Sequence, residues 1–539
     1  MNDLELKMQQ FGRLKNNRGT WENQWQQVSD FCLGRRDFTS HDQLGGRARQ
    51  YQVFDTTFQQ GADQLSAALQ TLLVNASSRW FWMADMNPQA MLNPALAEYY
   101  NVLTDGMYSI FNSPDANFGP QMHETLMDIV AFGTGVMYVE WSEQTQSVVF
   151  QSRPLSESYI MENSRGRVDT VYRSFRYTSR QAYDLWGEKA GEKCIENCKE
   201  GRGDTWMEFL HVVEPQKFVK HGSYSSERFP FRSVYINTQE RKVVEEGGYQ
   251  ELPYLCARWS KDSGEFYGRG PGITALPDAK MLNRMARTLL ASAEKAADPP
   301  ILMTDDGILS PVRTEPGGIN IVRPQPGGGV PLSYLENRAR MDIPMERFQT
   351  VKAQVQAAFY HQLLETFDDP RMSATQVLEL SSRTAQLIGP MIFRLQTELL
   401  EPMLARVAGL GIRSGILPPP PEELGAMPQI RYVSPAARAQ QNSDVQSIMG
   451  LTNTLMQWSQ LNPDILDNID MDKAARELGE AFGNASAILR PMAEIQEIRA
   501  AKNEAQQREQ QMQEMTQGAE AAGKAAPMLE MLQGGGTEG

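Results

Sequence analysis

Two glycine-rich segments of the sequence have a composition that could hold phosphate. Gly518, Gly523 and Lys524 fit the start of a GxxxxGK loop, whose backbone amides and lysine bind nucleotide phosphates. Ala525 follows, so the hydroxyl that would ligate Mg²⁺ is missing, and we interpret this segment as a solvated tail. The segment Gly268-Arg269-Gly270-Pro271-Gly272 also resembles a phosphate cradle, although no apolar strand leads into it and Pro271 removes one amide donor. Both a hinge before a helix and a nucleotide site remain open for this second segment.

The residue types that usually perform catalysis or bind metals form no recognisable pattern. His123-Glu124 begins an HExxH motif, but Met127 stands where the second zinc ligand is required. The aspartates between 464 and 472 lack the glycine and spacing of an EF-hand loop, so we interpret them as charges at a helix N-terminus. Asp368-Asp369 could be an acid/base pair or a solvated turn. The sequence therefore predicts no catalytic residue, no metal and no cofactor.

Composition limits the class of protein further. The chain has 539 residues, of which 41% are hydrophobic and 22% charged, so collagen-like, mucin-like and wholly disordered classes are excluded. Its net charge is −14, which argues against gripping nucleic acid over its whole surface but is compatible with a channel that DNA slides through. The sequence shows no signal-peptide pattern and no apolar stretch near the ~18 residues of a membrane span. We expect free cysteines and a soluble intracellular or virion protein.

Hydrophobic periodicity predicts a helical beginning followed by a β-rich module. The first 130 residues are predicted to be helical, with stripes at Trp21, Trp25 and Val28 and at Leu65, Leu69 and Leu72. Residues 136–260 are predicted to be β-rich with one helix near Ser179–Trp186. The expected strands are a hairpin at 136–141 and 148–150, and further strands at 171–177, 207–213, 233–237 and 254–259.

The middle of the chain carries two helices that each have one narrow apolar stripe. The first stripe contains Leu282, Met285 and Leu289, and the second, which begins after the N-cap Asp342, contains Phe348, Val351, Val355, Phe359, Leu363 and Phe367. A Pro/Gly-rich lobe with one expected strand at 319–323 separates them. A stripe of this kind packs against copies of the chain around a ring or within a bundle of one chain.

After a turn at Asp368-Asp369-Pro370, the chain is again predicted to be mainly helical. Ser373-Ala374-Thr375-Gln376 is a capping box that begins a helix expected to kink at Pro390. A proline linker at 418–421 precedes a short strand at 430–433. The predicted fold class is therefore α+β, mainly α.

Four short motifs, taken in order, resemble the head-to-tail connector, or portal, proteins of short-tailed, podovirus-type phages. They are Gly12-Arg13-Leu14-Lys15-Asn16-Asn17-Arg18, Ser78-Arg79-Trp80-Phe81-Trp82-Met83, Phe266-Tyr267-Gly268-Arg269-Gly270-Pro271 and Pro370-Arg371-Met372-Ser373-Ala374-Thr375-Gln376-Val377. The order of elements agrees along nearly the whole chain. Gln376 departs from the pattern, since relatives often have Glu there, but it still closes a capping box.

The resemblance implies a portal-type subunit divided into named regions. The wing would be 1–272 together with 373–429, the stem helices 273–298 and 343–367, and the clip 299–342. The tunnel loop would be 368–372, the crown 430–490, the barrel helix 491–520 and the disordered tail 521–539. Within these regions, the resemblance places Asp368, Asp369, Arg371 and Met372 facing DNA, and stem packing at Leu282, Met285, Leu289, Phe348, Val355 and Phe359.

The resemblance also implies a function without catalysis. The chain would form a ring, usually of twelve subunits, at one capsid vertex of the virion, and would conduct DNA during packaging and ejection. Expected partners are further copies of the chain, the major capsid and scaffolding proteins, terminase, tail adaptor and tail proteins, internal core proteins and double-stranded DNA, with no membrane. Assembly would take place in the host cytoplasm. The alternatives are another oligomeric virion component, such as a scaffold or internal core protein, and a nucleotide-binding enzyme using 268–272.

Overall fold

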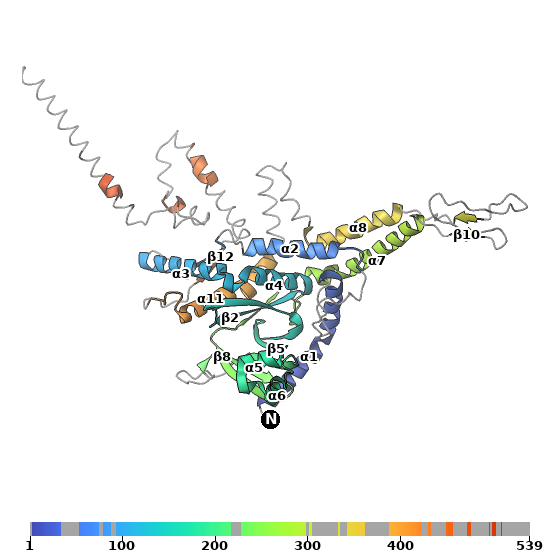
Figure 1. The fold of residues 1–539 in the computed structure, drawn as a ribbon. Helices are drawn as coiled ribbons and strands as arrows, with labels where there is room; N and C mark the ends of the chain where they lie inside the picture. The colour runs from blue at the N-terminus through green and yellow to red at the C-terminus, as the bar shows by residue number, and fades with distance from the viewer. Residues whose placement is uncertain are drawn as a thin grey trace, which may run out of the picture. The chain divides into compact units, whose positions relative to one another are not determined.

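The computed structural model describes residues 3–33, 53–74, 79–87, 93–216, 228–297, 301–303, 332–334, 342–361, 388–421 and 429–432, with short stretches between 449 and 508. The chain divides into two units, one of Met1–Pro88 with Glu98–Ala439 and one of Gln89–Ala97 with Gln440–Gly539. The fold is α+β and mainly helical, as predicted, and the first unit holds the described sheets (Figure 1). The following paragraphs concern the first unit.

The helices of this unit lie near their predicted positions. They are α1 (Asp3–Val28), α2 (Thr57–Leu73), α3 (Pro94–Asn112), α4 (Phe118–Phe132), α5 (Ser179–Trp186), α6 (Glu192–Lys199), α7 (Pro271–Ala297), α8 (Asp342–Ala358) and α11 (Glu401–Ser414), with π-helical turns η1 (Ser29–Leu33) and η8 (Gln396–Leu400). The stripe of α2 differs by one residue from the prediction, because Leu73 is buried and Leu72 only half-buried. The helix α6 is the exception and was not predicted, since half of its eight residues are charged and the segment shows little periodicity.

Two antiparallel sheets form the β-rich part. Three strands, β2 (Thr134–Ser142), β3 (Ser147–Arg153) and β9 (Tyr254–Arg258), are arranged in the order β3-β2-β9, and the first two make the predicted hairpin. The second sheet has the order β4-β5-β6-β7-β8 and consists of β4 (Ser158–Glu162), β5 (Val168–Thr178), β6 (Trp206–Pro215), β7 (Phe231–Asn237) and β8 (Lys242–Tyr249). The strands β4 and β8 were not predicted. In β8, charged residues and glycines interrupt the alternation of apolar and polar residues that would indicate a strand.

The five-stranded sheet is covered on both faces. One face packs Phe175, Met207 and Phe209 against Ala182 of α5 and Cys194 of α6. The other face packs apolar residues of β4 to β7 against four side chains of α1, namely Leu4, Met8, Phe11 and Leu14. The helix α5 begins where predicted because Thr178 and Gln181 form a capping box, in which each side chain accepts a hydrogen bond from the other residue's backbone amide.

A buried histidine joins the two sheets. His211 of β6 stacks on Tyr235 of β7 with ring centroids 3.9 Å apart, and its two ring nitrogens hydrogen-bond Tyr254 of β9 at 2.7 Å and Ser233 at 2.9 Å. Burial, together with the positive charge of Arg173 and Arg153, lowers the pKa of His211 well below its usual value. The imidazole is therefore neutral in the folded chain.

This histidine should make folding sensitive to mild acid. In the unfolded chain the His211 side chain takes up a proton near pH 6.5, whereas the folded chain does not, so stability is lost as the pH falls below about 6.5. The loss is at most about 1.4 kcal/mol per pH unit for one proton. Urea denaturation between pH 7.5 and 5.5 measures it, and His211→Asn should show a smaller slope. An unchanged slope in that variant would assign the effect to other groups.

One strand pair corrects the prediction that the first 130 residues are all helical. The strand β1 (Phe81–Ala84) pairs antiparallel with β12 (Gln429–Tyr432), the strand predicted at 430–433. On its other edge, the amides of Trp80 and Phe81 donate to the Tyr108 hydroxyl of α3 at 2.6 and 2.9 Å. The aromatic run around β1 is thus held by a distant strand and a neighbouring helix, and neither is visible in local periodicity.

Candidate functional site: the root of the α7–α8 helix pair

The two stripe helices form an arm. Figure 1 shows α7 and α8 side by side, running away from the sheets toward the strand β10 (Ile301–Met303). That strand pairs antiparallel with β11 (Leu332–Tyr334), so the chain leaves along α7 and returns along α8. Residues 304–331, with the strand expected at 319–323, lie outside the described residues.

The glycines before α7 permit direct contact between two backbones. A Cβ on Gly270 would lie 2.7 Å from the carbonyl oxygens of Ile129 and Val130, and one on Gly272 would lie 2.4 Å from that of Ala131. The first turn of α7 therefore sits on the carbonyl end of α4, where no side chain fits. The segment is a packed joint, in contrast to the hinge considered from the sequence.

The same contacts bear on the phosphate-cradle interpretation. The Gly268 amide donates to the Thr134 hydroxyl at 2.8 Å, and the Arg269 amide donates to the Ser260 carbonyl at 2.7 Å. Both amides are therefore occupied by acceptors of the chain itself. The carbonyl oxygens at the end of α4 are among the atoms nearest to Gly270 and Gly272, and these oxygens would repel an anion. The geometry gives the nucleotide alternative no support.

The stem-packing residues divide between the root and the outer part of the arm. At the root, Leu282, Val355 and Phe359 are buried, and the Phe359 ring meets Phe58 of α2 edge-to-face at 5.3 Å. Gly61 of α2 admits this ring, since a Cβ there would lie 2.7 Å from it. Farther out, Met285, Leu289 and Phe348 are only half-buried. The stripes are thus covered by the chain itself at the root but incompletely beyond it.

Large apolar side chains on the arm remain open to solvent. Leu290 of α7 is 50% exposed and Met345 of α8 is 54% exposed. Their exposure indicates that the outer arm needs a covering surface that this chain does not supply among its described residues.

The returning helix is interrupted within its predicted range of 343–367. The helix α8 stops at Ala358, and the Phe359 and Tyr360 amides instead donate to carbonyls three residues back. Tyr360 adopts a left-handed conformation, with φ 58°. This turn lets Phe359 enter the space above Gly61, and residue 361 is again helical. Residues 362–387 lie outside the described part, including the predicted DNA-facing residues Asp368, Asp369, Arg371 and Met372.

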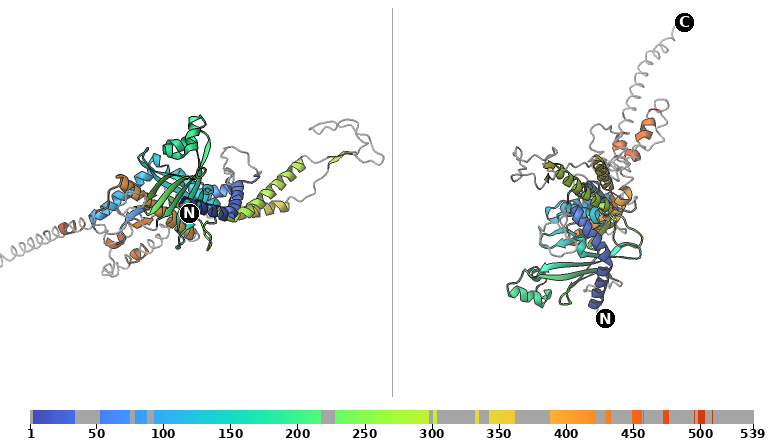
Figure 2. Two further views of the ribbon diagram at one scale, coloured as in Figure 1. Left: turned by 90° about the horizontal axis from the view of Figure 1, so that it is seen from below. Right: turned by 90° about the vertical axis from the view of Figure 1, so that its right-hand side faces the viewer.

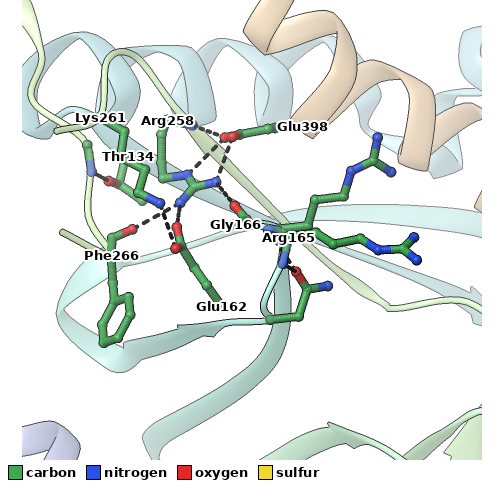
Figure 3. A network of polar contacts seen from close by, with 11 residues as sticks. Thr134, Glu162, Arg165, Gly166, Arg258, Lys261, Phe266 and Glu398 are labelled. Atoms are coloured by element: carbon green, nitrogen blue, oxygen red, sulfur yellow. Dashed lines mark hydrogen bonds and ion pairs between the residues drawn. The ribbon is translucent and has the colours of Figure 1, made fainter. Parts of the chain in front are cut away.

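A buried arginine ties the end of β9 to the π-helical turn η8. Arg258, at the end of β9, is 1% exposed. Its guanidinium donates to both carboxylate oxygens of Glu398 in η8, at 3.0 and 2.6 Å, and its backbone amide donates to the same carboxylate at 3.1 Å. Figure 3 shows the second carboxylate, Glu162, on the opposite side of the guanidinium, where it also pairs with Lys261 at 2.6 Å.

The remaining donors of Arg258 are also satisfied. Its terminal nitrogens donate to the carbonyls of Phe266 at 3.3 Å and Gly166 at 3.1 Å. Burial alone would lower the pKa of Arg258, but the hydrogen bonds and charges of Glu398 and Glu162 outweigh it and raise the pKa. The guanidinium therefore stays charged and links three separate segments of the chain.

Sequence analysis did not identify this network. The available signal was Glu398, a charged residue within the apolar stretch 387–412. Its partner could not be found, because η8 is π-helical and its extra residue per turn changes the direction in which Glu398 points. Helical residues 388–395 precede η8 and include Pro390.

Within the described ranges, no group of three or more His, Cys, Asp or Glu side chains could hold a metal ion. No helix in these ranges is both long and apolar enough to cross a membrane. What the geometry provides is mechanical: a projecting arm whose root is fixed by close backbone packing, and a buried charged network that joins β4, β9 and η8.

Comparisons with known proteins show which family has a similar sequence. The family model described as bacteriophage head to tail connecting protein matches residues 5–489. The chain is 26% identical over 532 residues to the probable portal protein of Bordetella phage BPP-1, covering 97% of this chain and 95% of that one. It is 28% identical over 509 residues to the portal protein of Salmonella phage epsilon15, covering 92% and 90%.

A solved structure described as the neck of an empty GTA particle computed with C6 symmetry also matches. It covers 73% of this chain and 86% of its own, with 13% identity and a TM-score of 0.35. A similarity of that size carries no argument.

Proposed function

The chain belongs to the family of bacteriophage head to tail connecting proteins, and we propose on this basis that it is a portal subunit, which assembles into a ring at one capsid vertex. The family match spans most of the chain. The alignments also cover nearly the whole length of the two phage relatives, which are named probable portal protein and portal protein. The ring would conduct DNA into the capsid during packaging and out of it during ejection. The protein would act without catalysis, and ATP hydrolysis would belong to a separate terminase.

The observation that carries the ring is the arm. Its root is packed within the chain, while Leu290 and Met345 farther out are half exposed or more. Neighbouring arms arranged side by side around an axis would cover these residues equally in every copy, which is the property of closed cyclic symmetry. We therefore assign α7 and α8 to the stem, the segment between them to the clip and the two sheets to the wing.

Further assignments follow from the portal role. The turn 368–372 would face the DNA, and the segments 430–490 and 491–520 would form the crown and barrel. Partners would be the major capsid and scaffolding proteins, terminase, tail adaptor and tail proteins, internal core proteins and double-stranded DNA. The protein would be located at the portal vertex of the virion after assembly in the host cytoplasm. An acidic chain suits a conduit, because a strongly basic lining would hold the DNA.

The direct test is the mass and shape of the purified protein. Twelve copies of the 60.6 kDa chain would give about 727 kDa in native mass spectrometry. Negative-stain microscopy should show rings with a central hole. A protein that stays monomeric over a wide concentration range would contradict the portal role, and filled or irregular particles would favour a scaffold.

The predicted tunnel loop has a test of its own. Deleting 369–372 should leave the ring intact but lower the amount of DNA packaged or retained per head, because Arg371 and Met372 would no longer reach the duplex. Deleting Gly534–Thr537, also four residues, is the matched control and should have no effect. Full-length, stably retained genomes in particles with the first deletion would show that this turn is not a gate.

A further inference from the structure

A groove opens where the two sheets meet α11. Its volume is about 510 Å³, within the range of roughly 300–1,000 Å³ typical of clefts that hold a ligand. Trp141 of β2, Phe229, Tyr249 of β8 and Leu410 of α11 supply apolar and aromatic walls. All four side chains are only partly buried, so the walls are accessible.

The charges of the groove are unequal. Three arginines line it, Arg228, Arg406 and Arg413, whereas the only carboxylates at this place among the described residues are Glu140 and Glu251. Glu251 is already engaged, since Arg413 donates to both of its carboxylate oxygens at 2.7 and 2.6 Å. In the described part of the chain, Arg228 has the ring of Phe229 beneath it at 4.6 Å but no carboxylate partner. Among the described residues, the groove therefore offers one cation without a carboxylate partner, Arg228, beside aromatic walls.

The outer side of α5 has the complementary character. The helix packs inward through Ala182 and Trp186, which leaves Asp184 outermost, with Tyr183 and Leu185 on the two flanks of the helix. Tyr183 is 42% and Leu185 62% exposed, although both are large and apolar. Asp184 lies between them and has no ion-pair partner among the described residues. We call these three residues the α5 ridge.

The ridge and the groove are separate places along the five-stranded sheet. The helix α5 begins after Thr178, and its other end reaches the middle of the sheet, where the Trp186 indole donates to Glu245 of β8 at 2.9 Å. The groove contains Tyr249, four residues farther along β8, a distance of about 13 Å. In the right-hand view of Figure 2, α5 and α6 project from one side of the unit and α11 lies toward the other.

We propose that the α5 ridge of one copy occupies the groove of the next copy, with Asp184 paired to Arg228 and with Tyr183 and Leu185 against the aromatic walls. The inference rests on the proposed ring. A contact between two different patches of one unit is heterologous, and repeating it gives a ring when the rotation between successive copies closes. The occupant is thus a second copy of this chain, selected by charge and by apolar surface.

The test is a charge exchange in the full-length protein. Asp184→Arg and Arg228→Glu should each raise the concentration for half-maximal ring assembly by about tenfold or more, because each places like charges together. The double variant should return it to within roughly threefold of the wild type, since the pair is restored with reversed sign. Asp115→Arg is the matched control and should assemble as the wild type does, because Asp115 is exposed and has no ion-pair partner among the described residues. Mass photometry gives the assembled fraction, and circular dichroism checks folding.

A crosslink provides an independent measurement. Asp184→Cys combined with Arg228→Cys should give, after oxidation of assembled rings, a ladder of covalent multiples that neither single variant gives. Single charge variants that assemble normally, a double variant no better than the singles, or the absence of a ladder would overturn the proposed contact while leaving the portal role intact. Failure of the wild type itself to form rings would instead contradict the proposed function.

Discussion

Replacing Glu398 with alanine is expected to lower the free energy of unfolding by about 3–5 kcal/mol, the usual cost of removing one partner from a buried ion pair. The substitution removes both guanidinium contacts at 3.0 and 2.6 Å and leaves Arg258, which is 1% exposed, without its closest counter-charge on that side. It also frees the Arg258 backbone amide. The effect is large because burial prevents water from replacing the lost carboxylate.

Urea denaturation of wild type and variant at one pH measures this difference. Glu401→Ala is the matched control, since Glu401 lies one helical turn farther along, is exposed and has no described partner; it should change stability by less than about 0.5 kcal/mol. Glu398→Gln should fall between the two, because it keeps a hydrogen-bond acceptor but not the charge. Equal midpoints for Glu398→Ala and Glu401→Ala would mean that the network around Arg258 does not stabilise the folded chain.

The second large effect is expected at Phe359. Phe359→Asp should cost about 4 kcal/mol or more, since it empties the space above Gly61 and buries a carboxylate in contact with Phe58. The apolar stripes alone, taken as contacts between copies, would predict that Asp at Phe359 or Leu282 blocks ring assembly. The structure indicates instead that these substitutions would already disturb folding of the single chain, before any assembly, because both side chains are buried within it.

Met345→Asp on the same helix is the informative comparison. Met345 is 54% exposed, so the chain should lose less than about 0.5 kcal/mol, yet ring assembly should decline if neighbouring arms cover this residue. Thermal unfolding and native mass spectrometry of both variants separate the two steps. A stable Phe359→Asp chain would refute the packing at the root, and normal rings from Met345→Asp would remove this residue from the contact.

Local sequence signals were sufficient for most elements of the first unit. The helices α5 and α7 and the β2–β3 hairpin lie close to their predicted bounds, because caps, turns and periodicity are properties of neighbouring residues. The strand β1 was missed because its partner β12 is hundreds of residues away. A strand defined by a distant partner leaves little trace in its own periodicity.

The candidate site was predictable only in part, for a similar reason. Periodicity identified the apolar face at Leu282, Val355 and Phe359, but not that α2 covers its lower end. The ion pair between Arg258 and Glu398 was hidden for a second reason, since a π-helical turn changes the direction of a side chain without changing the spacing of residues. The assignments of the stem residues and of 368–372 stay predictions.

The pairing of β1 with β12 has a consequence for synthesis of the protein. The ribosome adds roughly 5–20 residues per second, so β1 emerges tens of seconds before β12 exists to pair with it. During that interval the aromatic strand Phe81–Ala84 has one edge held by side chains of α3 and the other free. A free apolar edge invites pairing with another nascent chain, so products that stop before Gln429 should aggregate and depend on chaperones, whereas the completed chain closes its own edge.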